Sequence, residues 1–312
     1  MPTIAILLAT YNGEKYLKEQ LDSLLSQTMT DWHCYVHDDG STDGTVNILN
    51  EYSERMPDRF TILNYPATGS AKKNFMSIMK YVKEPYAMFC DQDDAWLPYK
   101  IKASFDRISQ LETDIPVLVH TDLIVADDRM NPISDSFYGY SGIHKVFGSY
   151  EHYLVENNIV GCTSIINRPL MNEAMKCNPA NIYMHDWWCA LIASAAGKIE
   201  LIDTSTVLYR QHGNNQIGAG KKQCPIERDI GRLLSKEQRA KKIKQYERER
   251  IQAEEILKLN IISEEKRKIA ETFFNLDNFP FTERMRLNRR ILKYGRFEAF
   301  ECALTAKPLN YR

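Results

Sequence analysis

Alternation between short β-type runs and helical patterns in the first hundred residues restricts the possible folds most. Apolar, β-prone runs occur at residues 3–9, 32–37, 60–63 and 86–89. Each run is followed by a segment whose apolar residues recur at helical spacing. Repeated β-α units predict a parallel sheet with right-handed crossovers and helices on both faces. We therefore expect an α/β fold.

The second half of the chain is less regular. Further strands are expected at residues 117–122, 159–166, 198–202 and 207–209. Pro169 can open a short helix, and a longer helix is expected from Trp187 to Ala195. After Pro225 the pattern is helical and charged, with 23 Lys and Arg against 14 Asp and Glu from residue 221 onward. We predict an α/β domain at 1–220 and a basic helical region at 221–312.

Polar residues follow the predicted strands at the points where the strands end. Tyr11, Asp39 and Asp93 are in such positions, and parallel strands bring their carboxyl ends to one edge, where ligands bind. The stretch Asp91-Gln92-Asp93-Asp94 places three carboxylates within four positions. Such a cluster suits a divalent cation, or it is a solvated acidic turn before the helix expected from Pro98. Both interpretations stay open at this point.

Composition excludes several classes of protein. No run of about 18 apolar residues is present, so no membrane-spanning helix is expected, and the N-terminus shows no signal-peptide pattern. The seven cysteines are scattered and form no Cys-x-x-Cys, so we expect reduced thiols and neither disulfides nor a zinc site. The loop after the first strand is not glycine-rich, which argues against nucleotidyltransferases and dinucleotide-dependent oxidoreductases. A cytoplasmic location is expected.

Several motifs together resemble the family-2 nucleotide-sugar glycosyltransferases, which have the GT-A fold. Ala9–Gly13, Asp38–Thr45 and Asp91–Asp94 occur in that family's order and spacing, and His185–Trp188 with Tyr209–Asn215 are similar to a downstream pair in bacterial polysaccharide members. The similarity covers about residues 1 to 220. No Gln-x-x-Arg-Trp signature is present, so processive synthesis is not expected. The resemblance implies a mostly parallel, Rossmann-like sheet flanked by helices.

The resemblance also implies a set of donor-binding residues. A nucleotide diphosphate sugar is the expected donor, with dTDP-rhamnose first and UDP-hexoses second. Asp39 is similar to the residue that accepts the imino proton of a pyrimidine, although it could instead cap the next helix, a task that Asp38 or Asp43 could also perform. Asp94 would orient the sugar or cap the helix after it. The remaining predicted donor contacts are Thr10, Tyr11, Lys73 or its neighbour Lys72, Asp91 and Gly161.

Mg²⁺ or Mn²⁺ is the implied cofactor, since the leaving diphosphate gathers negative charge as the bond breaks. Asp93 is the implied direct metal ligand, Asp91 lies near it, and His212 is a third ligand or a diphosphate contact. Arg210 could pair with phosphate.

Asp186 is the implied general base, because a carboxylate in reach of the acceptor hydroxyl can take its proton. It could equally cap the helix that begins after it. Trp187 and Trp188 could stack on an acceptor sugar, or they are buried anchors. Asp122 could hydrogen-bond sugar hydroxyls. An inverting transfer to a glycan hydroxyl in surface polysaccharide assembly is the function implied, and a non-catalytic sugar-binding module is the rival class.

The acceptor is expected to be a glycan or a lipid-linked glycan, and no nucleic-acid partner is expected. The segment Arg284–Tyr294 is basic and carries Leu287, Ile291 and Tyr294 at helical spacing. Such a helix can lie in an anionic membrane interface, which would place the enzyme at the inner face of the plasma membrane. Alternatively, its apolar stripe docks on the catalytic domain.

Overall fold

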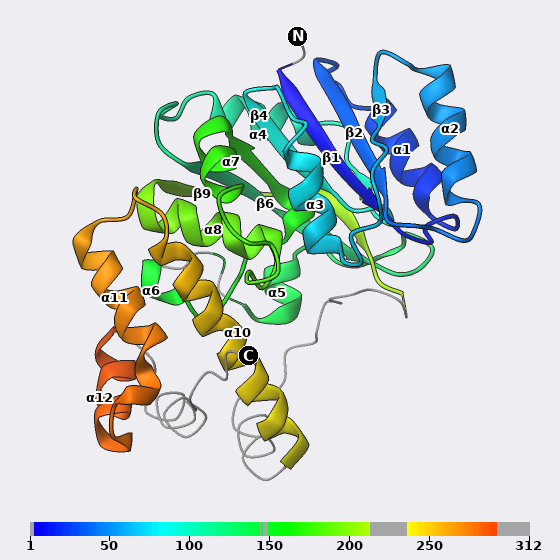
Figure 1. Cartoon of the computed structure of the whole chain (residues 1–312). Coiled ribbons are helices and arrows are strands. Elements are labelled where there is room, and N and C mark those ends of the chain that lie inside the picture. Colours follow the sequence, from blue (N-terminus) through cyan, green and yellow to red (C-terminus); the bar gives the residue numbers. More distant parts are fainter. Residues whose placement is uncertain (1–2, 144, 146–148, 213–235, 292–312) are drawn as a thin grey trace.

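A computed structural model describes residues 3–143, 145, 149–212 and 236–291, and its strands form one sheet (Figure 1). The strands are β1 Ile4–Thr10, β2 Trp32–Asp38, β3 Phe60–Ile62, β4 Tyr86–Cys90, β5 Ala95–Trp96, β6 Val117–Ala126, β7 Pro132–Ser134, β8 Ser164–Asn167 and β9 Lys198–Arg210. Within this part of the chain the order is β3-β2-β1-β4-β8-β6-β9-β5, with β7 paired to β6. The predicted α/β architecture is confirmed.

The helices predicted after the first four strands are present, and two short helices between residues 137 and 153 were not predicted. They are α1 Leu17–Leu25, α2 Thr45–Arg55, α3 Ala71–Met79, α4 Lys100–Ile108, α5 Phe137–Ser141, α6 Tyr150–Tyr153, α7 Arg168–Ala174, α8 His185–Ala196, α10 Lys236–Leu257, α11 Glu264–Phe274 and α12 Phe281–Ile291, with 3₁₀ turns η1 Gly161–Thr163 and η2 Leu276–Asn278. Ser70 caps α3 and Asn167 caps α7 through their side-chain oxygens, which accept backbone N–H groups that the helix leaves unpaired.

The sheet is parallel in its first half and mixed in its second. β1 pairs in parallel with β2 and β4, and β2 pairs in parallel with β3. β8 is antiparallel to both β4 and β6, whereas β6 and β9 are parallel. The carboxyl ends of β1, β2 and β4 therefore meet at one edge, as the sequence pattern required.

Two apolar layers cover the sheet, one on each face. β1 shows both: Ala5 and Leu7 pack in the layer with α3, α7 and α8, while Ile6 and Leu8 pack in the layer with α1, α2 and α4. All four side chains are fully buried, because alternate residues of a central strand point to opposite faces. The prediction of a central strand buried on both faces is confirmed.

Two predicted strands have different boundaries in the structure. Residues 159–166 do not form one strand, because the backbone N–H and the hydroxyl of Thr163 both bond to the Val160 carbonyl and close the turn η1. Conversely, β9 is a single strand where two were predicted. Its polar centre at Asp203 and Thr204 is exposed, yet β9 pairs with β6 on both sides of it, with local shifts in register.

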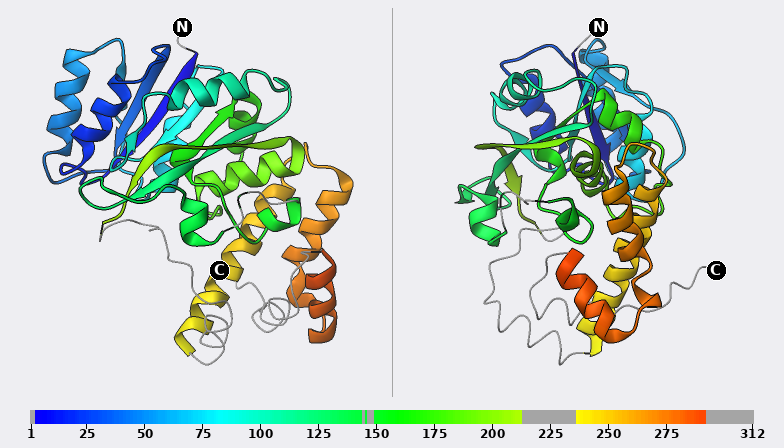
Figure 2. Two further views of the ribbon diagram at one scale, coloured as in Figure 1. Left: turned by 180° about the vertical axis from the view of Figure 1, so that it is seen from behind. Right: turned by 90° about the vertical axis from the view of Figure 1, so that its left-hand side faces the viewer.

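The helices α10 and α11 pack against the catalytic body and share its apolar layer. Tyr246, Ala253 and Ile256 of α10 and Phe273 of α11 are buried in the layer that also contains Trp188. α12 contacts α11, and the three helices extend beyond the body that the sheet forms (Figure 2). The predicted boundary at residue 220 lies outside the described residues. Among the helices that the structure describes, none has the length and apolarity needed to cross a membrane.

Candidate active site

The loops after β1 and β4 are joined by the side chain of Gln92. Its Oε1 accepts the Tyr11 N–H at 2.8 Å, and its Nε2 donates to the Tyr11 carbonyl at 2.9 Å. This pairing leaves the Tyr11 ring 57% exposed at the sheet edge, where it can stack on a flat ligand. Thr10 is buried and donates its hydroxyl to Asp38 at 2.8 Å, so it supports the next loop from below.

The two aspartates at the end of β2, Asp38 and Asp39, make different contacts. Asp38 accepts the N–H groups of Gly40 and Ser41 and so shapes the turn. One oxygen of Asp39 accepts the Thr68 N–H, and no bond to its other oxygen occurs within the described part of the chain. Neither residue caps α2, because Asp43 accepts the Thr45 N–H at 3.0 Å there. The capping alternative for Asp39 is therefore wrong, and its free oxygen is open to a ligand.

The structure distinguishes the two lysines at the start of α3. Lys72 is half-buried and donates its ammonium to the carbonyls of Ala180 (3.2 Å) and Ile182. Lys73 is exposed. Of the pair, Lys72 is held against the loop before α8, and Lys73 is free to contact a nucleotide.

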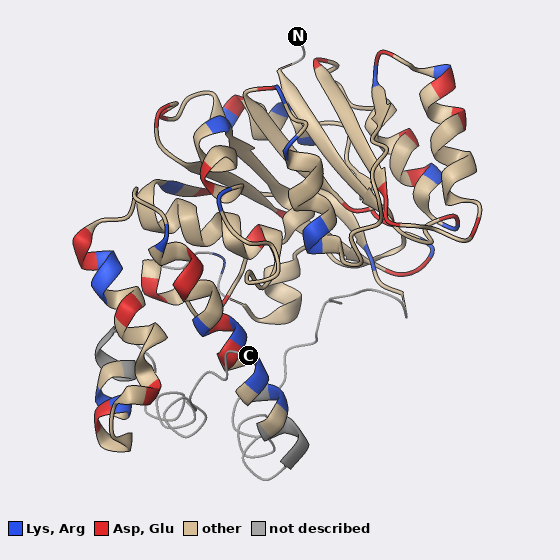
Figure 3. Ribbon diagram, in the orientation of Figure 1, with Lys and Arg blue, Asp and Glu red and all other residues tan. Residues whose placement is uncertain are grey.

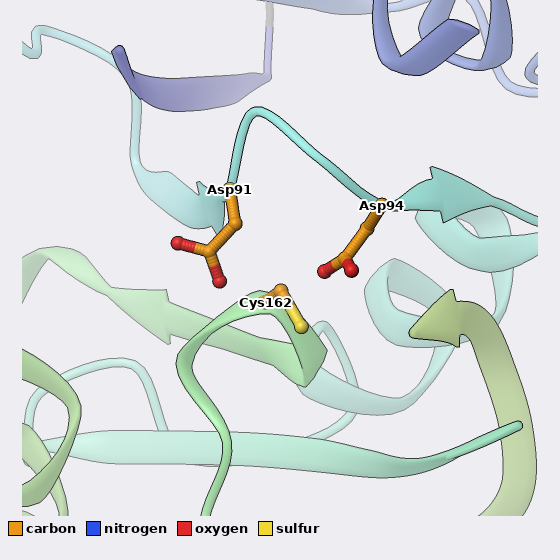
Figure 4. A group of neighbouring side chains, drawn as sticks. All are labelled: Asp91, Asp94 and Cys162. Carbon is orange, nitrogen blue, oxygen red and sulfur yellow. The ribbon is translucent and has the colours of Figure 1, made fainter. Parts of the chain in front are cut away.

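The acidic loop after β4 divides its carboxylates between two sides. Asp91 and Asp94 both point toward Cys162 (Figure 4), and ligand atoms of these three residues all lie within 4.8 Å of one another. Asp93 turns instead to His212, whose Nε2 lies 2.9 Å from Asp93 Oδ2. The predicted metal group Asp91, Asp93 and His212 is thus brought together only in part.

Burial and mutual repulsion make it unfavourable for the carboxylates of this loop to be ionised together without a cation. Burial, Asp93 and Asp186 raise the pKa of Asp91 to about 7, and burial with Asp93 and Asp91 raises that of Asp94. One oxygen of Asp94 is buried without a hydrogen bond among the described residues. Carboxylate oxygens are the ligands that Mg²⁺ and Mn²⁺ prefer, so the residues present fit a divalent cation.

Two predicted roles of Asp94 are corrected by its burial. Its side chain is inaccessible to solvent, and it accepts the Arg210 N–H at 3.1 Å. It is therefore not placed to orient a sugar. It does not cap α4 either, since that helix begins after Tyr99 without a side-chain cap.

Arg210 supports the acidic loop and is not available to a phosphate. It is 2% exposed. Its guanidinium donates to the carbonyls of Asp93 at 2.8 Å and Asp128 at 2.5 Å and pairs with Glu19. The predicted phosphate contact is wrong, because the side chain is committed to holding the loop from behind.

Asp186 lies in the first turn of α8 and faces η1. Its carboxylate accepts the N–H groups of Trp187 at 2.6 Å and Gly161 at 3.1 Å. The N-cap of α8 is Met184, so Asp186 is not a capping residue. Burial raises its pKa to about 6, and its charge reaches the acidic loop, where it contributes to the raised pKa of Asp91. A carboxylate with this pKa suits general-base catalysis near neutral pH.

His185 and Gly161 are close neighbours of Asp186. His185 is packed on Phe75 and Phe89, with ring centroids 4.1 and 4.5 Å away, and burial lowers its pKa to about 3. A Cβ on Gly161 would lie 2.9 Å from His185 Nε2, closer than side chains pack. A residue without a side chain is thus needed at 161 for the turn to approach Asp186.

The two tryptophans after Asp186 are buried anchors. Trp188 has no exposed surface and donates its indole N–H to the Ala174 carbonyl at 3.0 Å. Trp187 is 5% exposed and donates to the Tyr153 carbonyl at 2.7 Å. The prediction that they stack on an acceptor sugar is wrong, because Trp188 packs in the apolar layer with α3 and α7, and Trp187 is bonded to Tyr153 and packs on Tyr183.

Asp122 organises a loop and is closed to a sugar. It is 3% exposed, and its carboxylate accepts the N–H groups of Leu123 and Phe137 and the hydroxyl of Ser136. The predicted contact with sugar hydroxyls is therefore wrong. Among the predicted site acids, Asp39, Asp91, Asp93 and Asp186 remain accessible, each half-buried.

Residues 5–174 match the model of the family described as Glycosyl transferase family 2. The chain belongs to this family. A relative of this glycosyltransferase, the dTDP-rhamnosyl transferase RfbG of Shigella flexneri, is 33% identical over 230 residues, which are 68% of this chain and 74% of RfbG.

Solved glycosyltransferase structures have the same fold. The structure of S. aureus TarS 1-349 matches with a TM-score of 0.56 at 15% identity, over 96% of this chain and 90% of TarS 1-349. The mannosyltransferase PcManGT of Pyrobaculum calidifontis, in complex with GDP-Man and Mn²⁺, matches with a TM-score of 0.56 at 14% identity, over 97% of this chain and 73% of that one. The predicted GT-A fold is confirmed.

Sequence reasoning missed two supports of this glycosyltransferase site. Gln92 stands between the aspartates of Asp-x-Asp, where its position predicted only a loop residue. Lys100 is fully buried behind the loop, with its ammonium 4.6 Å from the centroid of the Trp96 ring, and burial lowers its pKa to about 8. A lysine two residues after a proline at the start of a helix reads as solvated, so the sequence held no signal for its burial.

Proposed function

We propose that this family 2 glycosyltransferase is an inverting, metal-dependent enzyme that moves a sugar from a nucleotide diphosphate sugar to a glycan hydroxyl in surface polysaccharide assembly. The observation that carries the proposal is the half-buried Asp186, whose charge contributes to the raised pKa of Asp91 in the acidic loop after β4. A base and a metal-binding loop so close together suit displacement at an anomeric carbon between them.

The proposed step is a displacement that involves the acceptor oxygen, the anomeric carbon and the leaving phosphate oxygen. Asp186 accepts the proton of the acceptor hydroxyl, and the acceptor oxygen forms a bond to the anomeric carbon. The bond from that carbon to the phosphate oxygen breaks, and the nucleoside diphosphate leaves. One displacement inverts the configuration. When bound, the divalent cation supplies positive charge to the leaving diphosphate.

Other residues of this chain are assigned to the base, the nucleotide and the cation. The free oxygen of Asp39 can accept the imino N–H of a pyrimidine, and the exposed Tyr11 ring can stack on the base. Lys73 is exposed at the start of α3, and we assign it a contact with the nucleotide. Asp91 and Asp93 would hold the cation, with His212 beside Asp93.

The proposed donor is dTDP-rhamnose, with UDP-hexoses as the second candidate. The identity to a protein named as a dTDP-rhamnosyl transferase supports the first. A TarS structure was determined with UDP-GlcNAc, which supports the second. Asp39 suits either, because thymine and uracil carry the same imino N–H.

A panel of nucleotide sugars tests the proposal. The purified protein is mixed with each donor, with and without Mn²⁺, and nucleotide diphosphate release is measured together with thermal shift. We expect release and stabilisation with dTDP-rhamnose or a UDP-hexose, both dependent on the metal. Full turnover in excess EDTA would contradict the metal role, and the absence of any donor effect across the panel would contradict the transferase assignment.

A further inference from the structure

Helix α10 is hydrogen-bonded to the loop between α7 and α8, which leads directly to Asp186. Gln252 and Glu255 of α10 are almost fully buried. Gln252 accepts the Tyr183 N–H at 2.8 Å, and Glu255 accepts the Asn178 N–H at 3.1 Å and the Asn181 side chain at 2.7 Å. The loop between α7 and α8 is thus anchored from one side by α10, and the position of α10 relative to Asp186 is set.

Cations gather around this loop from two elements far apart in sequence. Lys72 of α3 grips the carbonyls of Ala180 and Ile182, while the Arg248 guanidinium carbon of α10 lies 5.8 Å from the centroid of the Tyr183 ring. That ring packs on Trp187, the residue after Asp186, with centroids 4.7 Å apart. The two cations therefore flank the segment that leads directly into the proposed base.

These cations have no carboxylate partners within the part of the chain that the structure describes. No ion pair involves Lys72, Arg248 or Lys244, which lies one turn before Arg248 and is exposed like it. Burial, Arg248 and Lys73 together lower the pKa of Lys72, as repulsion between like charges requires. Like charges held together without a counter-charge favour the binding of an anion.

The cations of α10 lie on the part of the helix that projects from the catalytic body. Figure 3 shows Lys and Arg residues on this projecting half. Arg248 lies over the Tyr183 ring, which packs on Trp187, the neighbour of Asp186 in the first turn of α8. An anion bound by the cations of α10 would therefore lie near the segment that carries the proposed base.

We infer that Lys244 and Arg248, with the positive charge of Lys72 beside them, form an acceptor subsite that binds a phosphate or diphosphate group of the acceptor. The inference rests on the proposed transferase function and extends it by naming the chemical class of the acceptor. Arginine and lysine bind phosphate oxygens through charge-assisted hydrogen bonds, and an exposed arginine held over an aromatic ring is well placed to do so. The acceptor is either a lipid-linked diphosphate or a soluble phosphorylated glycan.

Binding of inorganic pyrophosphate tests the subsite without the donor. Calorimetry is carried out in excess EDTA on an Asp93→Asn background, which removes the metal-dependent site. We expect pyrophosphate to bind, and Lys244→Gln with Arg248→Gln to weaken it by about tenfold or more for each cation lost, the usual worth of an ionised hydrogen bond. Lys102→Gln on α4, an exposed lysine on the opposite face of the sheet, is the matched control and should change nothing.

Transfer kinetics give the second readout. With a diphosphate-linked acceptor, the double variant should raise the acceptor KM by about a hundredfold and leave the donor KM unchanged. Equal KM values for long-chain and butyl diphosphate acceptors indicate that the phosphates are recognised, and activity on the long chain alone indicates a lipid source. Unchanged pyrophosphate binding and acceptor KM in the double variant would overturn the inference. A wild-type protein that binds pyrophosphate through these cations yet transfers no sugar would refute the proposed function and leave the anion site standing.

Discussion

Four aspartates of the candidate site have the same side chain but differ in burial and in neighbouring groups. Asp91, Asp93, Asp94 and Asp186 are all carboxylates, yet Asp94 is inaccessible and Asp93 is half-buried beside His212. Asp186 has a pKa raised by burial, which suits a proton acceptor. The same functional group therefore has a structural role at Asp94 and is proposed to bind metal at Asp93 and to accept a proton at Asp186.

Replacement of Asp93 tests the metal role. Asp93→Asn keeps the shape of the side chain but removes a charged oxygen that a hard cation prefers. We expect transfer to fall below detection and the melting temperature to change by only a few degrees. Asp114→Asn, at an exposed acid before β6, is the control and should keep full activity. Substantial transfer by Asp93→Asn would show that the cation, if any, is held elsewhere.

Replacement of Asp186 tests the base. Asp186→Asn retains an oxygen that can accept the Gly161 N–H but cannot take a proton. Turnover should fall by about 10²–10⁴, the usual worth of general-base catalysis, with donor affinity nearly unchanged. The measurement is steady-state kinetics beside donor calorimetry. A variant that unfolds more easily but turns over normally would assign Asp186 a structural role alone.

The pH profile gives an independent view of the same residue. A base acts when deprotonated, so with a pKa of about 6 the turnover number should fall about tenfold per pH unit below that value and level off above it. The acidic limb should be absent from the residual activity of Asp186→Asn. A limb that persists in this variant belongs to another group.

At the scale of elements, side-chain to backbone bonds between sequence-distant segments set the shape of the site. Gln92 ties the loop after β4 to the loop after β1, Lys72 ties α3 to the loop before α8, and Gln252 ties that loop to α10. Buried backbone groups in loops require such partners, since no regular ladder supplies them. The relative positions of the loops around the site therefore depend on these three sets of hydrogen bonds.

Replacement of Trp188, at the contact of α7 and α8, tests whether this residue is a buried anchor. Trp188→Phe removes the bond to the Ala174 carbonyl and leaves a small cavity, which should cost about 1–3 kcal/mol of unfolding free energy. Denaturant unfolding measures it. The acceptor KM should stay within twofold of the wild type, and a large rise in KM without loss of stability would restore the stacking role.

At the scale of the whole molecule, the chain is a catalytic body with a helical region fastened to it. α10 and α11 dock on the body through the apolar layer they share with α8, and Lys266 of α11 donates to the last carbonyls of that helix. α12 contacts α11. Docking of the C-terminal region thus rests on α10 and α11, and the membrane role of the basic segment Arg284–Tyr294 stays a proposal. Residues 292–294 of that segment lie outside the described residues.

Liposome flotation tests the proposed membrane contact. We expect the protein to float with anionic liposomes at low salt, and Arg286, Arg289, Arg290 and Lys293 changed together to Glu to abolish it. Each cation near such a surface is worth about 1 kcal/mol, so reversal of four outweighs any single contact. The matched control reverses four exposed lysines of the body: Lys18, Lys83, Lys102 and Lys176. Loss of flotation in the control alone would place the contact on the body.

The sequence by itself determined the fold class, the order of the first four strands and helices, and the edge at which the site lies. These follow from local rules: apolar periodicity selects the element, and parallel strands bring their ends together. It also identified the family through the motifs at Asp38–Thr45 and Asp91–Asp94.

Only the tertiary structure decided which side chains at that edge are accessible. Asp94, Asp122, Trp187, Trp188 and Arg210 are adjacent to reactive positions in sequence, but packing against other segments buries them. Whether a residue is buried depends on segments distant in sequence that pack over it, and the residues around it in sequence do not reveal those contacts. The attachment of α10 to the Asp186 loop depends on contacts about 70 residues apart, such as Tyr183 with Gln252, for the same reason.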